Sequence, residues 1–182
     1  MSFEGLSDLN LVLLNIKARS VRLAILPRRR RKRRPLVDVR RGILLFLIFL
    51  GLSIVVHETC HLLVARALGY EADVHYGIEI PYVYGLVTID PPSRSPIDTL
   101  LIFSVGGLGA GAVFFILWHA IDDIIAKLLL SFFTSSQLAY GVMEPMAALG
   151  LLERAWLGTI PVAVGLAALI AFRVIYWRLG WW

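Results

Sequence analysis

The chain is poor in cysteine and in charged side chains. It has one cysteine, Cys60, and only 17% of its 182 residues are charged, whereas 58% are hydrophobic and the mean hydropathy is +0.76. A single cysteine excludes an intramolecular disulfide, and the scarcity of charge excludes an ordinary soluble domain of this length. We also expect no secretory signal, because the first long apolar run has no small-residue cleavage site near its end. The composition predicts a multi-pass membrane protein.

Four apolar stretches are long enough to cross a bilayer as helices, which takes about 20 residues each. They are residues 42–69, 98–119, 124 to about 143, and 156–177. The predicted fold class is therefore an all-α polytopic membrane protein with about four transmembrane helices, located in the cell membrane. Residues 42–182 would form one membrane-embedded domain.

Positive charge is concentrated before the first of these stretches. Twelve of the 18 Lys and Arg residues lie between Lys17 and Arg41, and seven of them form the uninterrupted run 28–34. Residues 6–26 mix apolar and basic side chains, as an amphipathic helix lying on a membrane does, and Pro27 ends that pattern. We interpret residues 1–41 as a cytoplasmic N-terminal arm that binds anionic lipid headgroups and fixes topology, with no nucleic-acid partner.

Residues 71–90 change character from apolar runs to alternation. Val74, Tyr76 and Ile78 alternate with smaller or polar residues, Pro81 interrupts the pattern, and residues 82–89 resume a run rich in β-formers. The pattern predicts a β-hairpin or small sheet inserted after the first span. Residues 91–96 follow as a proline-rich connector into the second span.

The sequence His57-Glu58-Thr59-Cys60-His61 has the form H-E-x-x-H and lies inside the first apolar stretch. Residues four apart share one face of a helix, so both imidazoles can reach one zinc ion while Glu58 stands beside them. A catalytic zinc site needs a third protein ligand as well. The motif therefore predicts a zinc-dependent hydrolase with Glu58 as its general base.

Glu144 is the best candidate for the third ligand. It is the one acidic residue besides Glu58 that sits well inside apolar sequence, where an unpaired carboxylate would cost several kcal/mol. Gly141 and Pro145 flank it, and we expect the third span to be broken there and to line a polar cavity. The alternative is that Glu144 only ends its helix near the membrane surface. Other possible donors are Asp122, Asp123, His119, His75 and Cys60, of which Cys60 is more readily a helix-packing residue.

The membrane setting makes a membrane-anchored protein the expected substrate, with peptide hydrolysis as the reaction. A helical peptide bond is shielded, so the substrate must be held extended, and a free hairpin edge could add it as another strand. We predict substrate contacts at Gly85, Leu86 and Val87, with a simple membrane-embedded flap as the alternative. Gly106 and Gly107 begin a run of small residues, and they are predicted either to contact substrate or only to allow tight helix packing.

These residues together resemble the site-2 protease family of intramembrane zinc metalloproteases. The likeness rests on residues 55–61 with Ala65 and Gly69, on residues 84–89 and on the glycines of 106–111, and it covers residues 43–150. The resemblance implies that His57 and His61 bind zinc and that Glu58 is the base.

The chain departs from that family's pattern at two places. The family's third ligand is usually an aspartate in Leu-Asp-Gly, whereas Met143-Glu144-Pro145 stands here, and the family's Gly-Pro-x-x-Asn is represented by glycines alone. Two alternatives therefore stay open. One is an inactive relative that binds metal and membrane-protein clients without cleavage, and the other is a membrane metalloprotease of the prenyl-protein type, which also uses a glutamate as its third ligand.

Overall fold

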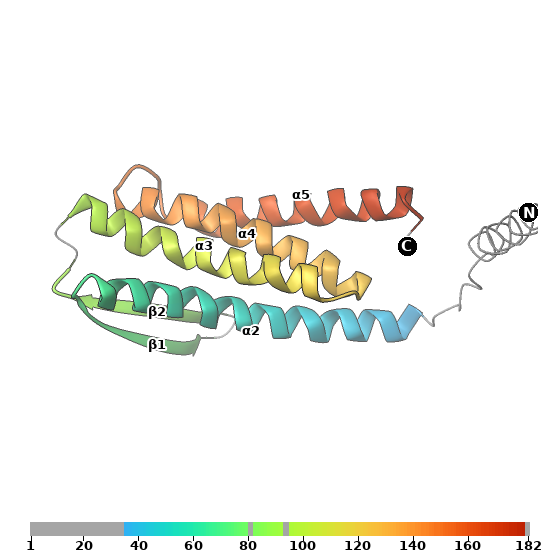
Figure 1. Cartoon of the computed structure of the whole chain (residues 1–182), viewed down its shortest axis with the longest axis horizontal. Coiled ribbons are helices and arrows are strands. Elements are labelled where there is room, and N and C mark those ends of the chain that lie inside the picture. Colours follow the sequence, from blue (N-terminus) through green and yellow to red (C-terminus); the bar gives the residue numbers. More distant parts are fainter. Residues whose placement is uncertain (1–34, 80–81, 93–94, 181–182) are drawn as a thin grey trace, which may run out of the picture. The chain divides into compact units, whose positions relative to one another are not determined.

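The chain folds into long helices and one hairpin in the computed structural model, which describes residues 35–79, 82–92 and 95–180. The elements, shown in Figure 1, are α2 (Pro35–Ala67), β1 (Glu71–Glu79), β2 (Tyr82–Asp90), α3 (Pro96–Ala120), α4 (Ile124–Ala148) and α5 (Trp156–Arg178). A mostly helical protein with a small sheet after the first span is therefore confirmed. The N-terminal arm up to residue 34 lies outside the described residues, so its lipid binding and its cytoplasmic side stay predictions.

Three of the four described helices are long and apolar enough to cross a membrane. They are Val39–Ala67 within α2, the whole of α3 and the whole of α5. The fourth, α4, has the same 25-residue length as α3 but includes polar side chains at Ser131, Thr134, Gln137 and Glu144. These three apolar helices indicate a membrane protein. Of the four spans expected, three are long and apolar enough among the described residues, and a membrane-spanning role for α4 stays a prediction.

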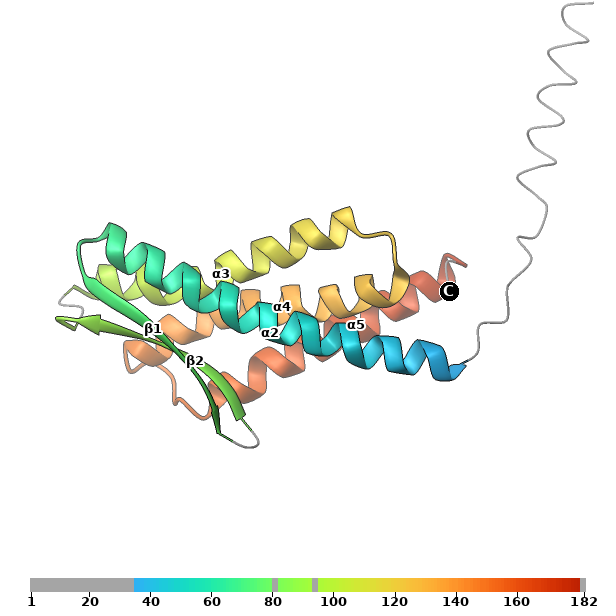
Figure 2. The same cartoon turned by 90° about the horizontal axis from the view of Figure 1, so that it is seen from below.

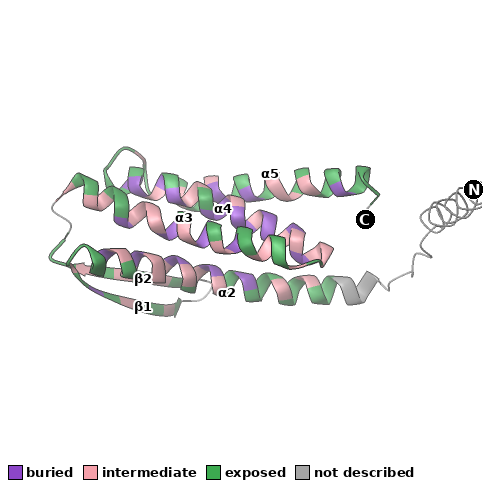
Figure 3. Ribbon diagram, in the orientation of Figure 1, coloured by how far each residue is buried: buried purple, intermediate pink, exposed green. Residues whose placement is uncertain are grey.

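The polar helix α4 is also the most shielded of the three helices that follow the hairpin. It has 12 buried residues, against six in α3 and three in α5, and it packs against both of them. The burial colouring of Figure 3 shows this concentration along α4. Because its neighbours cover it, α4 can carry polar groups that a lipid-facing helix could not.

The expected break in the third span is not found, so that prediction is wrong. Helix α4 runs without interruption from Ile124 to Ala148 and includes Pro145. A proline lacks the N–H that would bond four residues back, which weakens a helix locally. Here the proline lies within the last turn, so only one hydrogen bond near the end is lost, and the helix continues to Ala148.

Side chains cap the first two helices that follow the hairpin, α3 and α4. The Ser95 hydroxyl accepts a hydrogen bond from the Ile97 backbone N–H at 3.2 Å, with Pro96 next to it, as expected for the entry to this helix. The Asp123 carboxylate accepts from the Ala126 N–H at 3.0 Å and caps α4. Asp123 also forms an ion pair with Arg41 at 2.9 Å, which ties the turn before α4 to α2.

The hairpin pairs β1 with β2 in antiparallel register, with Glu71 opposite Asp90 and Glu79 opposite Tyr82. It folds back along α2, as Figure 2 shows. One face packs on the helices, because Val87 and Ile89 contact a buried cluster of Ala65, Ala72 and Ile102. This packing fixes which side of the hairpin faces α2.

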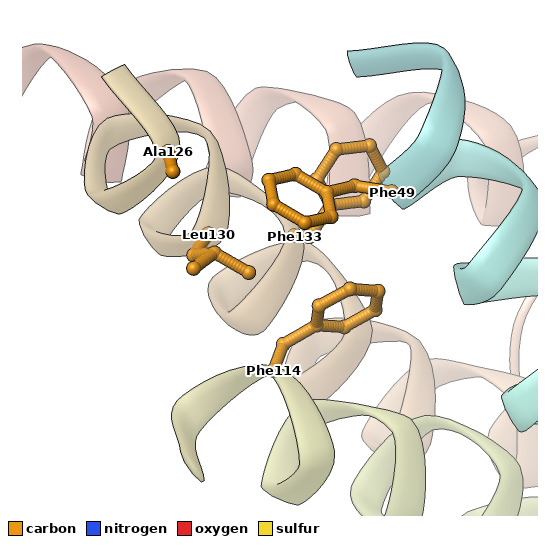
Figure 4. Close-up of a cluster of buried hydrophobic side chains, with 5 residues drawn as sticks. All are labelled: Phe49, Phe114, Ala126, Leu130 and Phe133. Atoms are coloured by element: carbon orange, nitrogen blue, oxygen red, sulfur yellow. The ribbon is translucent and has the colours of Figure 1, made fainter. Parts of the chain in front are cut away.

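A second buried cluster joins α2, α3 and α4. Figure 4 shows its members converging: Phe49 from α2, Phe114 from α3, and Ala126, Leu130 and Phe133 from α4. The ring centroids of Phe49 and Phe133 lie 6.1 Å apart in an edge-to-face arrangement. We call these five residues the aromatic cluster, and it anchors α2 to α4 two helical turns before His57.

Candidate metal centre

The two motif histidines are buried side chains in the C-terminal half of α2. His57 is 7% exposed and His61 is 4% exposed, and their ring centroids lie 4.6 Å apart. The helix continues through the whole motif, so the spacing of four residues places both rings on one face as the sequence predicts, where they meet edge to face. Their Nε2 atoms face each other at 2.9 Å.

Glu144 completes a triangle with these two rings. Its Oε2 atom lies 3.1 Å from His57 Nε2 and 3.3 Å from His61 Nε2. Among the described residues, His57, His61 and Glu144 form the group of His, Cys, Asp or Glu side chains placed to hold a metal ion. We call the two histidine Nε2 atoms and the Glu144 Oε2 atom the ligand triangle. The sequence prediction that a distant carboxylate joins the motif histidines agrees with this geometry.

Hydrogen bonds on the far side of each ring fix its tautomer. His57 Nδ1 lies 2.9 Å from Oε1 of Gln137, and His61 Nδ1 lies 2.6 Å from the carbonyl oxygen of Ile102. Both partners are acceptors, so each Nδ1 carries the proton and donates it. Gln137 is held in turn, because its Nε2 donates to the Ser53 hydroxyl at 2.6 Å. Each histidine Nε2 therefore keeps a free lone pair that points into the triangle.

The ligand triangle fits a cation and suits zinc in size. With each ring proton on Nδ1, two imidazole lone pairs and a carboxylate oxygen face one another at 2.9 to 3.3 Å, and a cation among them would stabilise this arrangement. Bonds of about 2.0 to 2.2 Å in tetrahedral geometry would place neighbouring ligand atoms roughly 3.3 Å apart. Three protein ligands are the number typical of catalytic zinc sites.

Glu58 lies beside the triangle and against the hairpin. It lines a cavity of about 90 Å³ together with His61 and Glu144. A side chain at Gly85 of β2 would overlap the Glu58 side chain, and its Cβ would lie 2.9 Å from Glu58 Cδ. The absence of a side chain at Gly85 therefore lets the strand pass directly over this carboxylate.

Two cavities meet at Glu58. The smaller cavity, of about 90 Å³, includes Leu86, Val87 and Ile102, and the larger cavity, of about 430 Å³, includes His57 and Gln137. Both are lined by Glu58 and Gly85. The predicted substrate residues Gly85, Leu86 and Val87 thus lie at the site, while their contact with substrate stays a prediction.

The small-residue run of α3 fits the space around the site tightly. A side chain at Gly106 would overlap the His61 ring, and one at Gly107 would overlap the backbone of α4 at Gly141. A Cβ at Gly109 would lie 2.5 Å from Cys60 Sγ. These contacts match the helix-packing alternative for the run and for Cys60. Neither Gly106 nor Gly107 lines the two cavities at the triangle. Contact of these two glycines with a substrate stays a prediction.

The other candidate ligands lie elsewhere. Asp123 caps α4, and Asp122 lies 3.7 Å from Lys127. His119 Nδ1 lies 3.0 Å from the Phe115 carbonyl oxygen, and His75 is exposed on β1 opposite Leu86. None of the four belongs to the ligand triangle.

Sequence reasoning missed the residues that orient the two rings. Ser53 and Gln137 hold His57, and the Ile102 carbonyl holds His61. A signal for Gln137 was present, because it stands seven residues before Glu144 and therefore on the same face of a helix. The Ile102 carbonyl left no signal, because a backbone acceptor is independent of residue type.

Comparison with known proteins adds no relative to these observations. The chain matches no protein-family model, no curated protein and no solved structure.

Proposed function

We propose that the chain is an intramembrane zinc metalloprotease that cuts membrane-anchored proteins. The observation that carries the proposal is the ligand triangle, in which His57, His61 and Glu144 come together from two helices with their tautomers fixed for metal binding. An H-E-x-x-H glutamate stands beside it and lines the adjoining cavities. The likeness of the motifs to site-2 proteases supports the same reaction class.

Zinc in this site would supply Lewis-acid activation of water and of the peptide carbonyl. Glu58 would accept a proton from the attacking water as its oxygen bonds to the carbonyl carbon. When the carbon–nitrogen bond breaks, the same carboxyl would give that proton to the departing amine. Gln137 and the Ile102 carbonyl would keep both rings in the metal-binding tautomer throughout.

The setting supports a substrate that lies in the membrane. The triangle lies between α2, which is apolar enough to span a bilayer, and α4, which would be the fourth helix at membrane depth. β2 passes over Glu58 at Gly85, so an extended segment placed alongside β2 would bring a peptide bond to the site.

Metal analysis and cleavage of one substrate panel test the proposal. Purified wild type should hold about one zinc per chain, and Glu58→Gln should keep it because Glu58 is not a ligand. On single-span peptides in lipid nanodiscs, Glu58→Gln should lower kcat by about 10²- to 10⁴-fold. Zinc binding with equal absence of cleavage in both proteins would instead support a metal-binding protein without protease activity.

One observation favours a second candidate, a membrane metalloprotease of the prenyl-protein type. The carboxylate in the ligand triangle is Glu144 and not an aspartate, which matches that type of site. The two candidates differ in substrate. Faster cleavage of a prenylated C-terminal peptide than of any single-span peptide would support the second candidate.

A further inference from the structure

The larger cavity is an apolar groove that ends at the metal site. Its α2 lining runs from Phe46 to Glu58, a distance of roughly 18 Å at 1.5 Å per residue. Most of its lining away from the triangle is aromatic or aliphatic and comes from three helices: Phe46, Leu50, Ile54, Phe132, Phe133 and Val162. The polar groups near its inner end, Ser53 and Gln137, already bond to each other and to His57. The groove therefore suits an apolar group more than a polar one.

The two cavities that adjoin Glu58 differ nearly fivefold in volume. The larger measures about 430 Å³ and the smaller about 90 Å³. Leu86, Val87 and Phe103 line the smaller cavity. A bulky side chain therefore has more room on the side of Glu58 that faces the larger cavity.

The difference in cavity volume would determine which side chains of an extended substrate fit on each side of Glu58. Successive side chains of a strand point to opposite faces, so the two residues that flank the cut bond cannot enter the same cavity. Resting on the proposed protease function, we infer that the cut bond is flanked by a large apolar side chain, seated in the larger cavity, and by a small residue on its other side. Leu50 and Ile54 of α2 then determine specificity, because they line the larger cavity without touching the ligand triangle.

Filling the cavity tests the inference. Leu50 is 36% exposed and can be enlarged with little disturbance of the core, and Leu47 on the same helix is 57% exposed and lines neither cavity at the triangle. Leu50→Trp is therefore the test variant and Leu47→Trp the matched control. The probe is a set of single-span Leu/Ala peptides in nanodiscs, in which each position is changed in turn to Phe, with cut sites found by mass spectrometry.

Wild type should cut peptides with Phe on one fixed side of the bond with a kcat/KM about tenfold or more above that of the Ala peptide. Leu50→Trp should lower the ratio of kcat/KM for the Phe peptide to kcat/KM for the Ala peptide to about one. Leu47→Trp should keep the ratio of the wild type. Cleavage with no preference for a large residue on either side, or equal behaviour of the two Trp variants, would overturn the inference and leave the protease proposal standing.

A binding readout separates this inference from failure of the protease proposal. In the Glu58→Gln protein, a peptide of the same set carrying p-benzoylphenylalanine should crosslink to fragments containing residues 46–54 or 132–140. Leu50→Trp should reduce that crosslink and Leu47→Trp should not. If no peptide is cut, crosslinking to these fragments still supports the pocket, and crosslinking confined to other fragments overturns it.

Discussion

Helix α2 meets α4 at two neighbouring places that are equally buried and chemically opposite. At the first, Phe49 is 5% exposed and packs edge to face on Phe133. Two turns later, His57 is 7% exposed and is bonded to Gln137. The aromatic cluster is complete as it stands, because apolar packing needs no further partner. The ligand triangle differs, because its two nitrogen atoms and one oxygen atom are placed to hold a metal ion.

The comparison shows how one helix pair can combine stability with chemistry. The aromatic cluster holds α2 and α4 at a fixed distance. One turn further along α2, the hydrogen bonds from Gln137 to Ser53 and His57 depend on that distance between the helices. Loss of the cluster should therefore affect stability, and loss of the triangle should affect metal binding. The following experiments separate the two.

Removing a ligand should have the largest effect on metal binding. Glu144→Ala takes one side from the ligand triangle, and we expect bound zinc to fall from about one per chain to background. The free energy of structural zinc binding is about 10 to 16 kcal/mol in small peptides, so the loss of one ligand should weaken zinc binding strongly. Inductively coupled plasma mass spectrometry measures the zinc content per chain. The control is Glu153→Ala, because Glu153 is exposed. Full zinc in Glu144→Ala would place the third ligand elsewhere.

Removing a ring from the aromatic cluster should lower stability and leave zinc binding intact. Phe114 is fully buried, and Phe114→Ala should lower the free energy of unfolding by about 3 to 5 kcal/mol while zinc content stays at one per chain. Thermal unfolding in detergent measures the first effect and metal analysis the second. A Phe114→Ala protein that stays folded but loses its zinc would show that the two regions are not separable.

A chelator should test the contribution of the ligand triangle to stability by removing its zinc from the wild-type protein. Zinc that binds the folded chain raises its midpoint of thermal unfolding, so a chelator should lower the midpoint of wild type. It should leave Glu144→Ala unchanged, because that variant has no zinc to lose. An equal decrease in both proteins would mean that the stabilising ion is bound outside the triangle.

Loosening one ring should have an intermediate effect on metal affinity. Gln137→Leu removes the acceptor that fixes the tautomer of His57, and we expect zinc affinity to fall by about 10- to 100-fold. Competition with a fluorescent chelator measures the change. Thr134→Val is the control, because it makes a buried polar residue of the same helix apolar one turn earlier, away from the rings. Similar losses in both variants would point to helix packing as the cause.

The smallest effect is expected at Cys60, which lies inside the motif but outside the ligand triangle. Cys60→Ala should leave zinc content and affinity unchanged, because Cys60 Sγ faces Gly109 of α3. A loss of zinc in this variant would mean that the thiolate is a fourth ligand, which would describe a closed structural site.

Much of the fold could be predicted from sequence because membrane insertion and strand alternation leave strong patterns. The spans of α2, α3 and α5 follow from apolar length, and the hairpin follows from the alternation of Val74, Tyr76 and Ile78. The polar content of α4 lowers its apolarity, so that helix was expected but its continuity through Pro145 was not. A proline near a helix end permits either outcome, and local sequence does not decide between them.

The sequence by itself determined that two imidazoles would share one helix face with Glu58 beside them, because residues four apart in a helix point the same way. Only the tertiary structure decided that Glu144, and not Asp122 or Asp123, would meet those rings, and that Gln137 and the Ile102 carbonyl would orient them. The physical reason is distance along the chain. These contacts join residues 41 to 87 positions apart, so they depend on how α2, α3 and α4 pack. The glycines and aromatic side chains where these helices cross set that packing.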